Sequence, residues 1–559
     1  MSQIPLKTGF RIKHYTLLRH IENGSYGIVY LAKDEEQNQQ VVIKECFPEA
    51  VIKRGEEGEL IPHEEEVDYL NRQIERLIYE AELLASLDHP GIVGYRAHFK
   101  ALNTAYLVLD FVEGEDFYDF QERRSLCDHE LRQFMLQLAD ALSYMHDQKI
   151  CHLDLKPTNI LLNMQGDPVV IDFGGAWRQQ ELDDQVMSRL IYTPRYSPLE
   201  NKSVEDVDPR SDLFSLGATL YRHISGFFPP HSLMRKRHLE TFGKDPLVPA
   251  AVVGKQRYSQ ELLKAIDQAL ALDVAERPAT LHLWLEQHPL GNQPSTPSPA
   301  LFKSLKQADI DARSARYIEA TRHYQDAANR KIPQALRGMA CMLMEQEDSE
   351  KQSQSAILLH VKAGQMGDSA GYMEAAWLLG RYPSPDEAIN QTFCYAKAAQ
   401  QLHPIALYKH ALLLLDKPKK STDYRHGVSC LRQAAQMGHD KAQIKLAKLQ
   451  MKRPLPAGSK ESPYLWLLDA AEQKSSKAQL LLARCYEQGV APHTTPNLEE
   501  AFYWYKRAAN FEVTEAERIT GLWYLEGRGT KPSRSRARFW LELAADKGDT
   551  EAQEALQRL

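Results

Sequence analysis

The stretch that decides the fold is HLDLKPTNILLNMQGDPVVIDFG, residues 152–174. Its apolar runs at 160–162 and 169–171 are separated by a polar turn and predict two short strands after a loop. Four polar side chains stand near the ends of these strands: Asp154, Lys156, Asn159 and Asp172. Mg²⁺ is usually bound by one or two carboxylates together with substrate phosphates. The stretch therefore predicts a site for Mg²⁺ and phosphates, against the simpler alternative of a β-hairpin with solvated polar residues.

The order of these polar residues resembles a known motif. H-x-D-x-K-x-x-N followed by D-F-G is similar to the catalytic loop and metal-binding motif of eukaryotic-type protein kinases. The resemblance implies that Asp154 orients the substrate hydroxyl and that Lys156 stabilises the transferred phosphoryl group. It also implies that Asn159 and Asp172 bind Mg²⁺ and that ATP is the phosphoryl donor.

A glycine turn lies between two strand-like runs in residues 15–47. Gly24 and Gly27 stand in this turn, and glycine lets a backbone approach phosphates closely because it has no Cβ. The turn resembles the glycine-rich loop of protein kinases, which binds the nucleotide. Glu22 departs from the family pattern, because it takes the place of the first glycine of G-x-G-x-x-G. This departure predicts a looser fit of the loop on nucleotide.

The strand after the turn ends in VVIK, which supplies a candidate phosphate-binding lysine, Lys44. Val29 and Val42 are expected on the face of these strands that meets the nucleotide. A buried ammonium needs a partner of opposite charge, and the helical pattern IERLIYEAELLASLDHP offers three: Glu75, Glu80 and Glu82. The spacing of Glu80 from His89-Pro90 matches the corresponding helix of the kinase family, so Glu80 is predicted to hold Lys44.

AYLVLDFVEGEDF, residues 105–117, reads as a buried strand that leaves into a polar turn. By resemblance it is the hinge between the two kinase lobes, with Leu109 as the residue that guards the adenine pocket. Backbone groups of Asp110 and Val112 would meet the adenine, and Asp116 would contact the ribose. Leu161 completes the predicted nucleotide-binding residues.

Three later motifs separate protein kinases from small-molecule kinases. YTPRYSPLE contains Thr193 and Glu200, the second at the position of the family's A-P-E glutamate. Asp212 matches a buried aspartate beneath the catalytic loop, and Arg277 matches the partner of that glutamate. Lys156 together with Thr193 is the serine/threonine version of the pattern.

The residue before Asp154 is Leu153, where many regulated kinases have an arginine that pairs with a phosphorylated loop residue. Leucine has no donor to offer. Ser188 is the only hydroxyl residue between Gly175 and Leu190. We therefore expect activity that does not require phosphorylation of this loop.

The composition is that of an ordinary globular chain: 559 residues, 43% hydrophobic and 26% charged, which predicts two to four domains. A net charge of -7 gives no argument for nucleic acid. The seven cysteines form no C-x-x-C pair and are expected to be free thiols in a reducing compartment. The N-terminus has no signal-peptide core, and no apolar run approaches the ~20 residues of a membrane span. A soluble, cytoplasmic protein with no nucleic-acid or membrane partner is expected.

Beyond the proline-rich segment GNQPSTPSPA, residues 291–300, pairs of small residues recur about every 36 residues. They are Ala327-Ala328, Ala363-Gly364, Ala398-Ala399, Ala434-Ala435, Ala470-Ala471, Ala508-Ala509 and Ala544-Ala545. Such a period is the signature of a helical-hairpin solenoid, whose surface typically holds another protein. YLEGRGTKPSRSRARFWLELAADKGD and its preceding unit resemble Sel-like repeats, relatives of the tetratricopeptide repeat. The unit count is expected to be six or seven.

The expected architecture is an α+β bilobal protein kinase fold, with a small β-rich N-lobe and a helical C-lobe, followed by an all-α solenoid. The predicted domains are residues 1–290, a linker at 291–300, and residues 301–559. The predicted function is an ATP-dependent serine/threonine protein kinase whose repeats recruit substrates or regulators; the pairing resembles bacterial proteins. The alternative is a pseudokinase scaffold. The substrate, the partner of the repeats, the oligomeric state and any autoinhibition are not specified by the sequence.

Overall fold

The structure is a computed structural model and describes most of the chain, namely residues 5–24, 27–48, 52–62, 67–178, 193–202, 207–289, 299–329, 333–346, 349–416, 420–452, 462–489 and 495–559. It divides into two compact units: residues 1–224 with 250–368, and residues 225–249 with 369–559. Among the described residues, no helix has both the length and the apolar character needed to cross a membrane.

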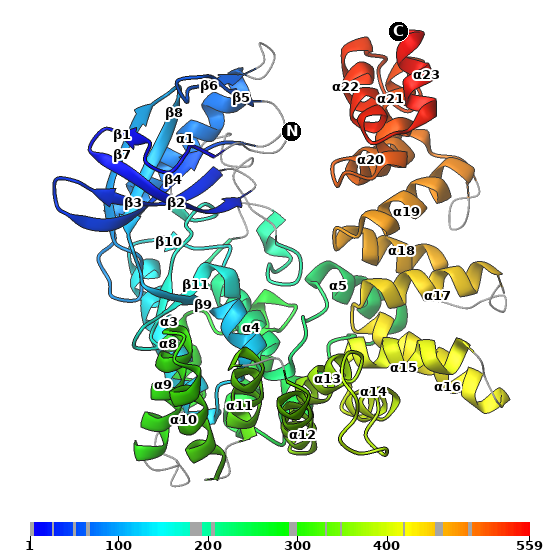
Figure 1. Cartoon of the computed structure of the whole chain (residues 1–559). Coiled ribbons are helices and arrows are strands. Elements are labelled where there is room, and N and C mark those ends of the chain that lie inside the picture. Colours follow the sequence, from blue (N-terminus) through cyan, green and yellow to red (C-terminus); the bar gives the residue numbers. More distant parts are fainter. Residues whose placement is uncertain are drawn as a thin grey trace. The chain divides into compact units, whose positions relative to one another are not determined.

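The first unit begins with a six-stranded antiparallel sheet in the order β1-β2-β3-β4-β8-β7 (Figure 1). Its strands are β1 Arg11–Ile12, β2 Tyr15–Gly24, β3 Gly27–Asp34, β4 Gln39–Cys46, β7 Tyr95–Ala101 and β8 Thr104–Asp110. Strands β2 and β3 flank the glycine turn expected from the sequence, and Gly24 pairs with Gly27. A side chain at Gly27 would put its Cβ 2.4 Å from the carbonyl oxygen of Glu45, so only glycine lets β3 lie this close to β4. A small hairpin, β5 Ile52–Arg54 with β6 Leu60–Pro62, follows β4.

Helix α1, Val67–Ala85, packs on this sheet with contacts to β4, β7 and β8. Its apolar residues repeat with the helical period, so Leu70, Ile74, Leu77 and Leu84 are buried on one face. Glu80 lies on the same buried face and is 4% exposed. A carboxylate in that position requires a charged partner, which connects the helix to the sheet.

The helical part of the first unit surrounds α3, Asp128–Asp147, whose buried face is formed by leucines, alanines, Phe134 and two methionines. Residues 152–174 form a loop and two short strands, as expected from the sequence. The strands form a three-stranded sheet in the order β12-β11-β9, in which β9 comes from the segment after β8. The remaining elements are β9 Gly114–Asp116, α2 Phe117–Arg123, β10 Ile150–Cys151, the 3-10 helix Pro157–Asn159, β11 Ile160–Asn163, β12 Pro168–Val170, β13 Trp177–Arg178, the 3-10 helix Glu200–Lys202, α4 Pro209–Ser225, α6 Ala250–Val253, α7 Gln260–Ala269, the 3-10 helix Val274–Glu276 and α8 Leu281–Gln287.

Four further helices belong to this same unit although they follow the proline-rich segment. They are α9 Pro299–Arg313, α10 Tyr317–Asn329, α11 Pro333–Gln346 and α12 Glu350–Gln365. Residues 290–298 lie outside the described residues. The unit therefore extends past the predicted linker at 291–300, while the predicted domain boundaries stay a prediction.

The second unit is a stack of antiparallel helices (Figure 1). Its helices are α5 Ser232–Phe242, α13 Ser369–Leu378, α14 Gln391–Gln400, α15 Pro404–Asp416, α16 Ser421–Gln436, α17 Asp440–Lys452, α18 Pro463–Glu472, α19 Ser476–Gln488, α20 Leu498–Ala509, α21 Thr514–Glu526, α22 Arg534–Asp546 and α23 Thr550–Gln557. Helix α5 precedes the stack in sequence and joins it through ion pairs of Arg237 with Asp469 and Glu472 of α18.

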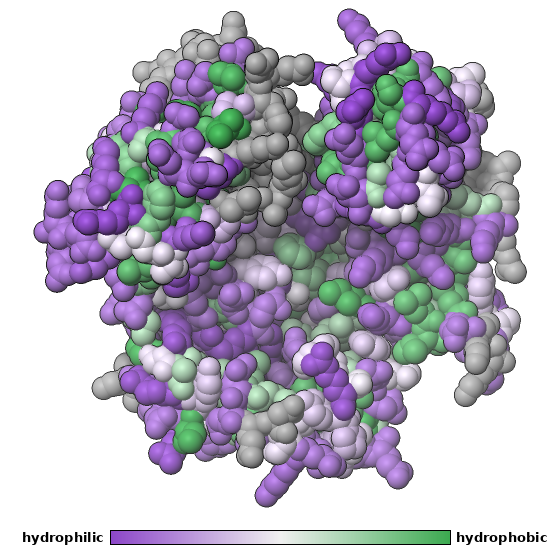
Figure 2. Space-filling model, turned by 45° about the horizontal axis from the view of Figure 1, so that its top comes forward, coloured by the Kyte–Doolittle hydropathy of each residue, from purple (hydrophilic) through white to green (hydrophobic). Residues whose placement is uncertain are grey.

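The recurring small-residue pairs mark the ends of alternate helices, from α10 to α22. Ala363, Ala398, Ala434, Ala470, Ala508 and Ala544 are each fully buried, because a neighbouring helix lies against the Cβ. A larger side chain at this point would separate the two helices. The surface around these cores is mixed, with scattered hydrophobic residues among predominantly hydrophilic ones on the face seen in Figure 2.

Candidate active site

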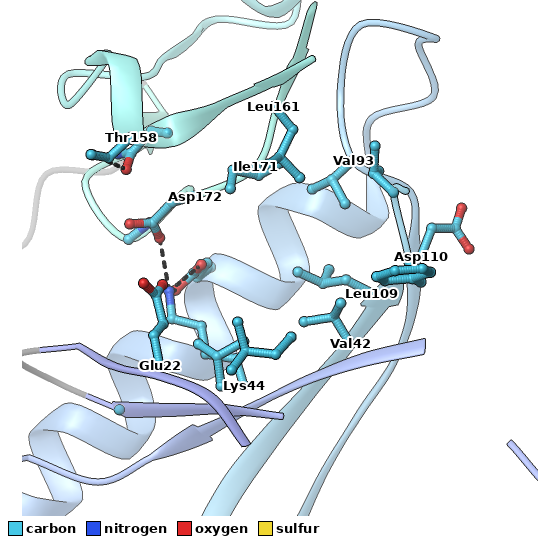
Figure 3. Close-up of a pocket in the computed structure, with 18 of the residues that line it drawn as sticks. Glu22, Val42, Lys44, Val93, Leu109, Asp110, Thr158, Leu161, Ile171 and Asp172 are labelled. Carbon is cyan, nitrogen blue, oxygen red and sulfur yellow. Dashed lines mark hydrogen bonds and ion pairs between the residues drawn. The ribbon is translucent and has the colours of Figure 1, made fainter. Parts of the chain in front are cut away.

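A cavity of about 410 Å³ lies between the six-stranded sheet and the short strands β11 and β12 of residues 152–174. One end is apolar, where Val42, Val93, Leu109, Leu161 and Ile171 converge (Figure 3). The other end is charged and contains Lys44, Glu80 and Asp172. Its size and its division into an apolar and a charged end are those of a site for a small, charged organic ligand.

Lys44 connects the sheet, helix α1 and the end of β12. Its Nζ donates to Glu80 Oε1 at 2.8 Å and Oε2 at 3.0 Å, and to Asp172 Oδ1 at 2.8 Å. Of the three glutamates offered by the sequence, Glu80 is therefore the one that contacts this lysine. Strand β4 positions Lys44 because alternate residues face the cavity, as Val42 does two residues earlier.

The charges of this cluster depend on one another. Burial alone would lower the pKa of Lys44, but the nearby carboxylates of Asp172 and Glu80 outweigh it and raise that pKa. Burial likewise opposes ionisation of Asp172, but the Lys44 ammonium holds the pKa of this carboxyl well below its ordinary value. Burial raises the pKa of Glu80 despite the attraction of Lys44. The charged end of the cavity thus contains the Lys44 ammonium, which could bind a polyanion, and the Asp172 carboxylate, which could bind a metal ion.

The carboxylate of Asp154, in the loop before β11, accepts several hydrogen bonds. Lys156 Nζ donates to Asp154 Oδ2 at 2.6 Å, and Thr193 Oγ1 donates to Asp154 Oδ1 at 2.5 Å. Asn159 Nδ2 donates to the backbone oxygen of Asp154 at 2.9 Å and to its Oδ2 at 3.2 Å. These donors fix the orientation of the Asp154 carboxylate, which is 4% exposed.

The loop itself is held from below by Asp212, near the start of α4. The backbone N–H groups of His152 and Leu153 donate to its two carboxylate oxygens at 2.8 and 2.7 Å. His146 Nε2 lies 2.8 Å from Asp212 Oδ2. Asp212 is fully buried, and burial would raise its pKa, but His146 and the backbone donors lower it. A charged Asp212 is therefore available to hold the loop.

The late motifs also meet in space. Arg277 is 3% exposed and forms a two-pronged ion pair with Glu200, at 2.6 and 3.0 Å. Its Nη1 also donates to the backbone oxygen of Arg210, at the start of α4. These bonds connect the segment after Thr193 to the helix that carries Asp212.

Eight of the predicted nucleotide-binding residues line the cavity. Those that line it are Gly27, Val29, Val42, Lys44, Asp110, Val112, Asp116 and Leu161. Gly24 lies at the end of β2, opposite Gly27. The backbone N–H of Asp110 donates to Gly94 at 2.8 Å, so the group of Asp110 that a ligand could use is its carbonyl oxygen. The Asp110 side chain points away from the cavity (Figure 3).

Glu22 also lines the cavity, and Figure 3 draws it on the side of the charged end. It pairs with Val29 across β2 and β3, so it faces the cavity where a glycine would leave space. The carboxylate of Glu22 opposes the approach of a polyanionic ligand by like-charge repulsion. It is the feature of the cavity that fits an anionic ligand least well.

Sequence reasoning missed several lining residues, among them Val93, Ile171 and Arg76. Arg76 of α1 donates from Nη2 to the backbone oxygen of Gly174 at 2.7 Å and from Nε at 3.2 Å. Its position four residues before Glu80 puts both on one face of α1, and this helical spacing is the signal that could have identified it. Ser188, the hydroxyl residue singled out in the sequence, lies outside the described residues.

Asn159 and Asp172 fit a Mg²⁺ ion by their chemistry. Both line the charged end of the cavity and offer oxygen atoms, one from an amide and one from a carboxylate that stays ionised. The amide nitrogen of Asn159 donates to Asp154, so the amide oxygen of Asn159 is on the side of the amide group away from Asp154. This donor set suits a hard cation that also binds phosphates.

Comparison with known proteins assigns a family to both parts of the chain. Residues 15–289 match the protein kinase domain, and residues 404–439, 476–510 and 514–549 match the Sel1 repeat. The chain contains a protein kinase domain followed by Sel1 repeats. The fold class expected from the sequence is confirmed. The matched repeats correspond to the helix pairs α15–α16, α19–α20 and α21–α22.

Two curated relatives are human serine/threonine-protein kinase Sgk2, 31% identical over 42% of this chain, and serine/threonine-protein kinase Sgk1 of Gallus gallus, 32% identical over 39% of this chain. The chain spans 59% and 47% of the length of these relatives. Among solved structures, PpkA-294 in its apo form is 26% identical and has a TM-score of 0.45, covering 50% of this chain and 98% of that one.

Proposed function

We propose that this protein is a serine/threonine protein kinase that transfers the γ-phosphoryl group of ATP to hydroxyl groups of proteins. The observation that carries the proposal is the ion-pair cluster of Lys44, Glu80 and Asp172 at the charged end of a cavity whose other end is apolar. Protein kinases generally use this lysine–glutamate pair and this aspartate together. The curated relatives that match the domain are serine/threonine kinases.

The roles of the residues follow from their positions. The apolar end, with Val42, Leu109 and Leu161, would hold the adenine, and Asp116 would contact the ribose. Lys44 would hold the phosphates that are not transferred. Asn159 and Asp172 would hold Mg²⁺, which supplies charge neutralisation for the phosphates.

Asp154 would orient the attacking hydroxyl of the substrate and accept its proton. A new bond forms between that oxygen and the γ-phosphorus, and the bond from the γ-phosphorus to the bridging oxygen of ADP breaks. Lys156, already beside Asp154, would stabilise the charge on the transferred group. Thr193, which donates a hydrogen bond to the same carboxylate, would lie beside the hydroxyl of a serine or threonine substrate.

The repeats provide the second part of the proposal. Sel1 repeats are helical hairpins stacked into a surface that other proteins bind, so we propose that they recruit a substrate or regulator. A cytoplasmic location also stays a prediction, to which the seven free thiols in the structure add support.

A pseudokinase scaffold is the second candidate, and Glu22 is the observation that favours it. Its carboxylate at the charged end of the cavity opposes phosphates. Lys44, Asp154, Asn159 and Asp172 are nevertheless all present, whereas a pseudokinase usually lacks at least one of these groups. The active kinase is therefore the better supported of the two.

The test compares transfer of radiolabelled phosphate from ATP to the protein itself and to a generic protein acceptor. Asp154→Ala should lower incorporation by roughly 100-fold or more, the usual contribution of a positioned base. Asp140→Ala is the matched control, because that carboxylate is 78% exposed on α3 and pairs only at the surface with His89. Equal incorporation by wild type and Asp154→Ala would rule out the kinase and leave the scaffold.

A further inference from the structure

Helix α2 joins the cavity to helices that lie beyond the kinase domain. Its N-cap is Asp116, whose side chain accepts a hydrogen bond from the N–H of Asp119 at 2.8 Å. Strand β9, just before α2, pairs with β11 so that Asp116 lies opposite Leu161. Both residues line the cavity. The position of α2 therefore sets the position of one wall of the cavity.

The other end of α2 is completed by α11. The last carbonyl groups of a helix have no partner within the helix and must find one elsewhere. Arg337 Nη2 donates to the backbone oxygen of Glu122 at 2.7 Å and to that of Gln121 at 3.4 Å. Cys341 Sγ lies 3.7 Å from the backbone oxygen of Arg123. With only seven residues, α2 depends on such outside partners for its stability.

A buried ion pair fastens α9 beside the same helix end. Arg124 is 1% exposed and donates to both carboxylate oxygens of Asp309, at 3.0 and 2.5 Å. The hydroxyl of Tyr324 donates to Asp309 as well, at 2.5 Å. Burial would raise the pKa of Asp309, but Arg124 lowers it, so both partners stay charged. Around them, Cys127 shares one apolar core with Leu305, Ala308 and other residues of α9, α10 and α11.

The most direct link to the cavity is Arg313, the last residue of α9. Its Nε donates to Glu115 Oε1 at 2.7 Å, and its Nη1 donates to the backbone oxygen of Asn163 at 2.8 Å. Glu115 belongs to β9 and Asn163 to β11, so one buried guanidinium bridges the two strands that carry Asp116 and Leu161. Arg123 of α2 holds the same Glu115 through two bonds of 2.7 Å.

We propose that helices α9–α11 are a built-in positioning element for the nucleotide, and that Arg313 is its positioning residue. Arg313 does not line the cavity; it acts by fixing β9 against β11, and hence the place of Asp116 and Leu161. The proposal extends the proposed function, because it assigns nucleotide binding to the same cavity. It also assigns helices α9–α11 to the support of the nucleotide site rather than to the part of the chain that recruits partners.

The test measures the Kd of ADP with Mg²⁺ by calorimetry, together with KM for ATP and kcat, on the full chain with Arg313→Ala. Loss of the bridge should raise the Kd and KM by about 3- to 10-fold and leave kcat nearly unchanged, the pattern of lost positioning before the chemical step. Arg313→Lys should fall between wild type and Arg313→Ala, because lysine keeps the charge but cannot reach both acceptors with one fork.

The control is Arg518→Ala, which removes an ion pair of similar kind, with Asp549 and Glu551, in the other compact unit. It should leave the Kd of ADP unchanged. A Kd of Arg313→Ala and Arg313→Lys equal to that of wild type would overturn the proposal, as would a loss of kcat without a change in Kd. If Arg313→Ala fails to fold, Arg313→Lys decides alone. Wild type that binds ADP but transfers no phosphate would refute the proposed kinase activity and leave this inference testable by binding.

Discussion

Leu153 has an unusual backbone conformation and a fully buried side chain. It has a φ of 62°, in the left-handed region, where a leucine costs about 1–2 kcal/mol. The bonds from His152 and Leu153 to Asp212 offset this cost and hold the loop. The Leu153 side chain is fully buried in a cluster with Cys151, Trp177 and Val207. The side chain at position 153 is thus packed among buried residues and, unlike an arginine, has no donor for a phosphate.

The leucine at position 153 predicts that phosphorylation of the segment that contains Ser188 is not needed for activity. Phosphatase treatment and Ser188→Ala should each leave kcat within about twofold of wild type, because no arginine at position 153 can bind the added phosphate. The measurement is phosphate transfer to a protein acceptor, with mass spectrometry to verify that the segment is unmodified. A large loss on dephosphorylation, recovered after incubation with ATP, would contradict the prediction.

At the scale of elements, the repeats share a turn whose geometry recurs. The third residue after the small-residue pair has a positive φ in each of six turns, and it is Gly367, Leu402, Gly438, Lys474, Glu512 or Gly548. Glycine adopts this conformation without strain, whereas the other residues carry a cost. The sequence period predicts the turn, but the left-handed residue is hidden where leucine, lysine or glutamate occupies it.

Gly548 allows the cost of this turn to be measured. A Cβ added there would meet no atom within 4 Å, so Gly548→Ala changes the backbone energy alone. We expect a loss of about 1 kcal/mol, which should raise hydrogen exchange of α22 and α23 by about fivefold. Glu512→Gly, at the same point of the preceding turn, should shift exchange of its helices less and in the opposite direction, because glycine also gains freedom in the unfolded chain. Unchanged exchange in Gly548→Ala would show that the turn carries no strain.

The sequence predicted helices and strands better than it predicted the contacts between them. The two short strands expected from the apolar runs at 160–162 and 169–171 are β11, Ile160–Asn163, and β12, Pro168–Val170, because apolar runs and turn residues are local signals. The contact of Arg124 with Asp309 joins residues 185 apart and has no periodic trace. In the site, motifs pointed to Lys44 and Asp172, which carry charge. The hydrogen bond from Arg76 to the backbone oxygen of Gly174 could not be predicted from the sequence, because every residue has a carbonyl oxygen.

At the scale of the molecule, buried histidines make stability depend on pH. His360 of α12 is 3% exposed, and burial, aided by the nearby Arg337, lowers its pKa to about 3, although Asp368 acts against this. The unfolded chain binds a proton at His360 below about pH 6.5 and the folded chain does not until about pH 3. Since the unfolded state binds more protons in this window, stability falls as pH falls through it. Burial lowers the pKa of His152 and His223 too, so they add to the same slope.

His360→Leu removes one part of this slope and so measures it. Between pH 7 and pH 5 the wild type should lose about 2 kcal/mol of unfolding free energy through His360 alone, because a pKa shift of this direction acts over about 1.5 pH units there. The variant should lose correspondingly less in urea unfolding followed by circular dichroism at the two pH values. His282→Leu is the control, since that ring is 82% exposed and should keep the wild-type slope. Equal losses of unfolding free energy in His360→Leu and wild type would show that His360 binds its proton in the folded chain as readily as in the unfolded chain. That result would contradict the prediction.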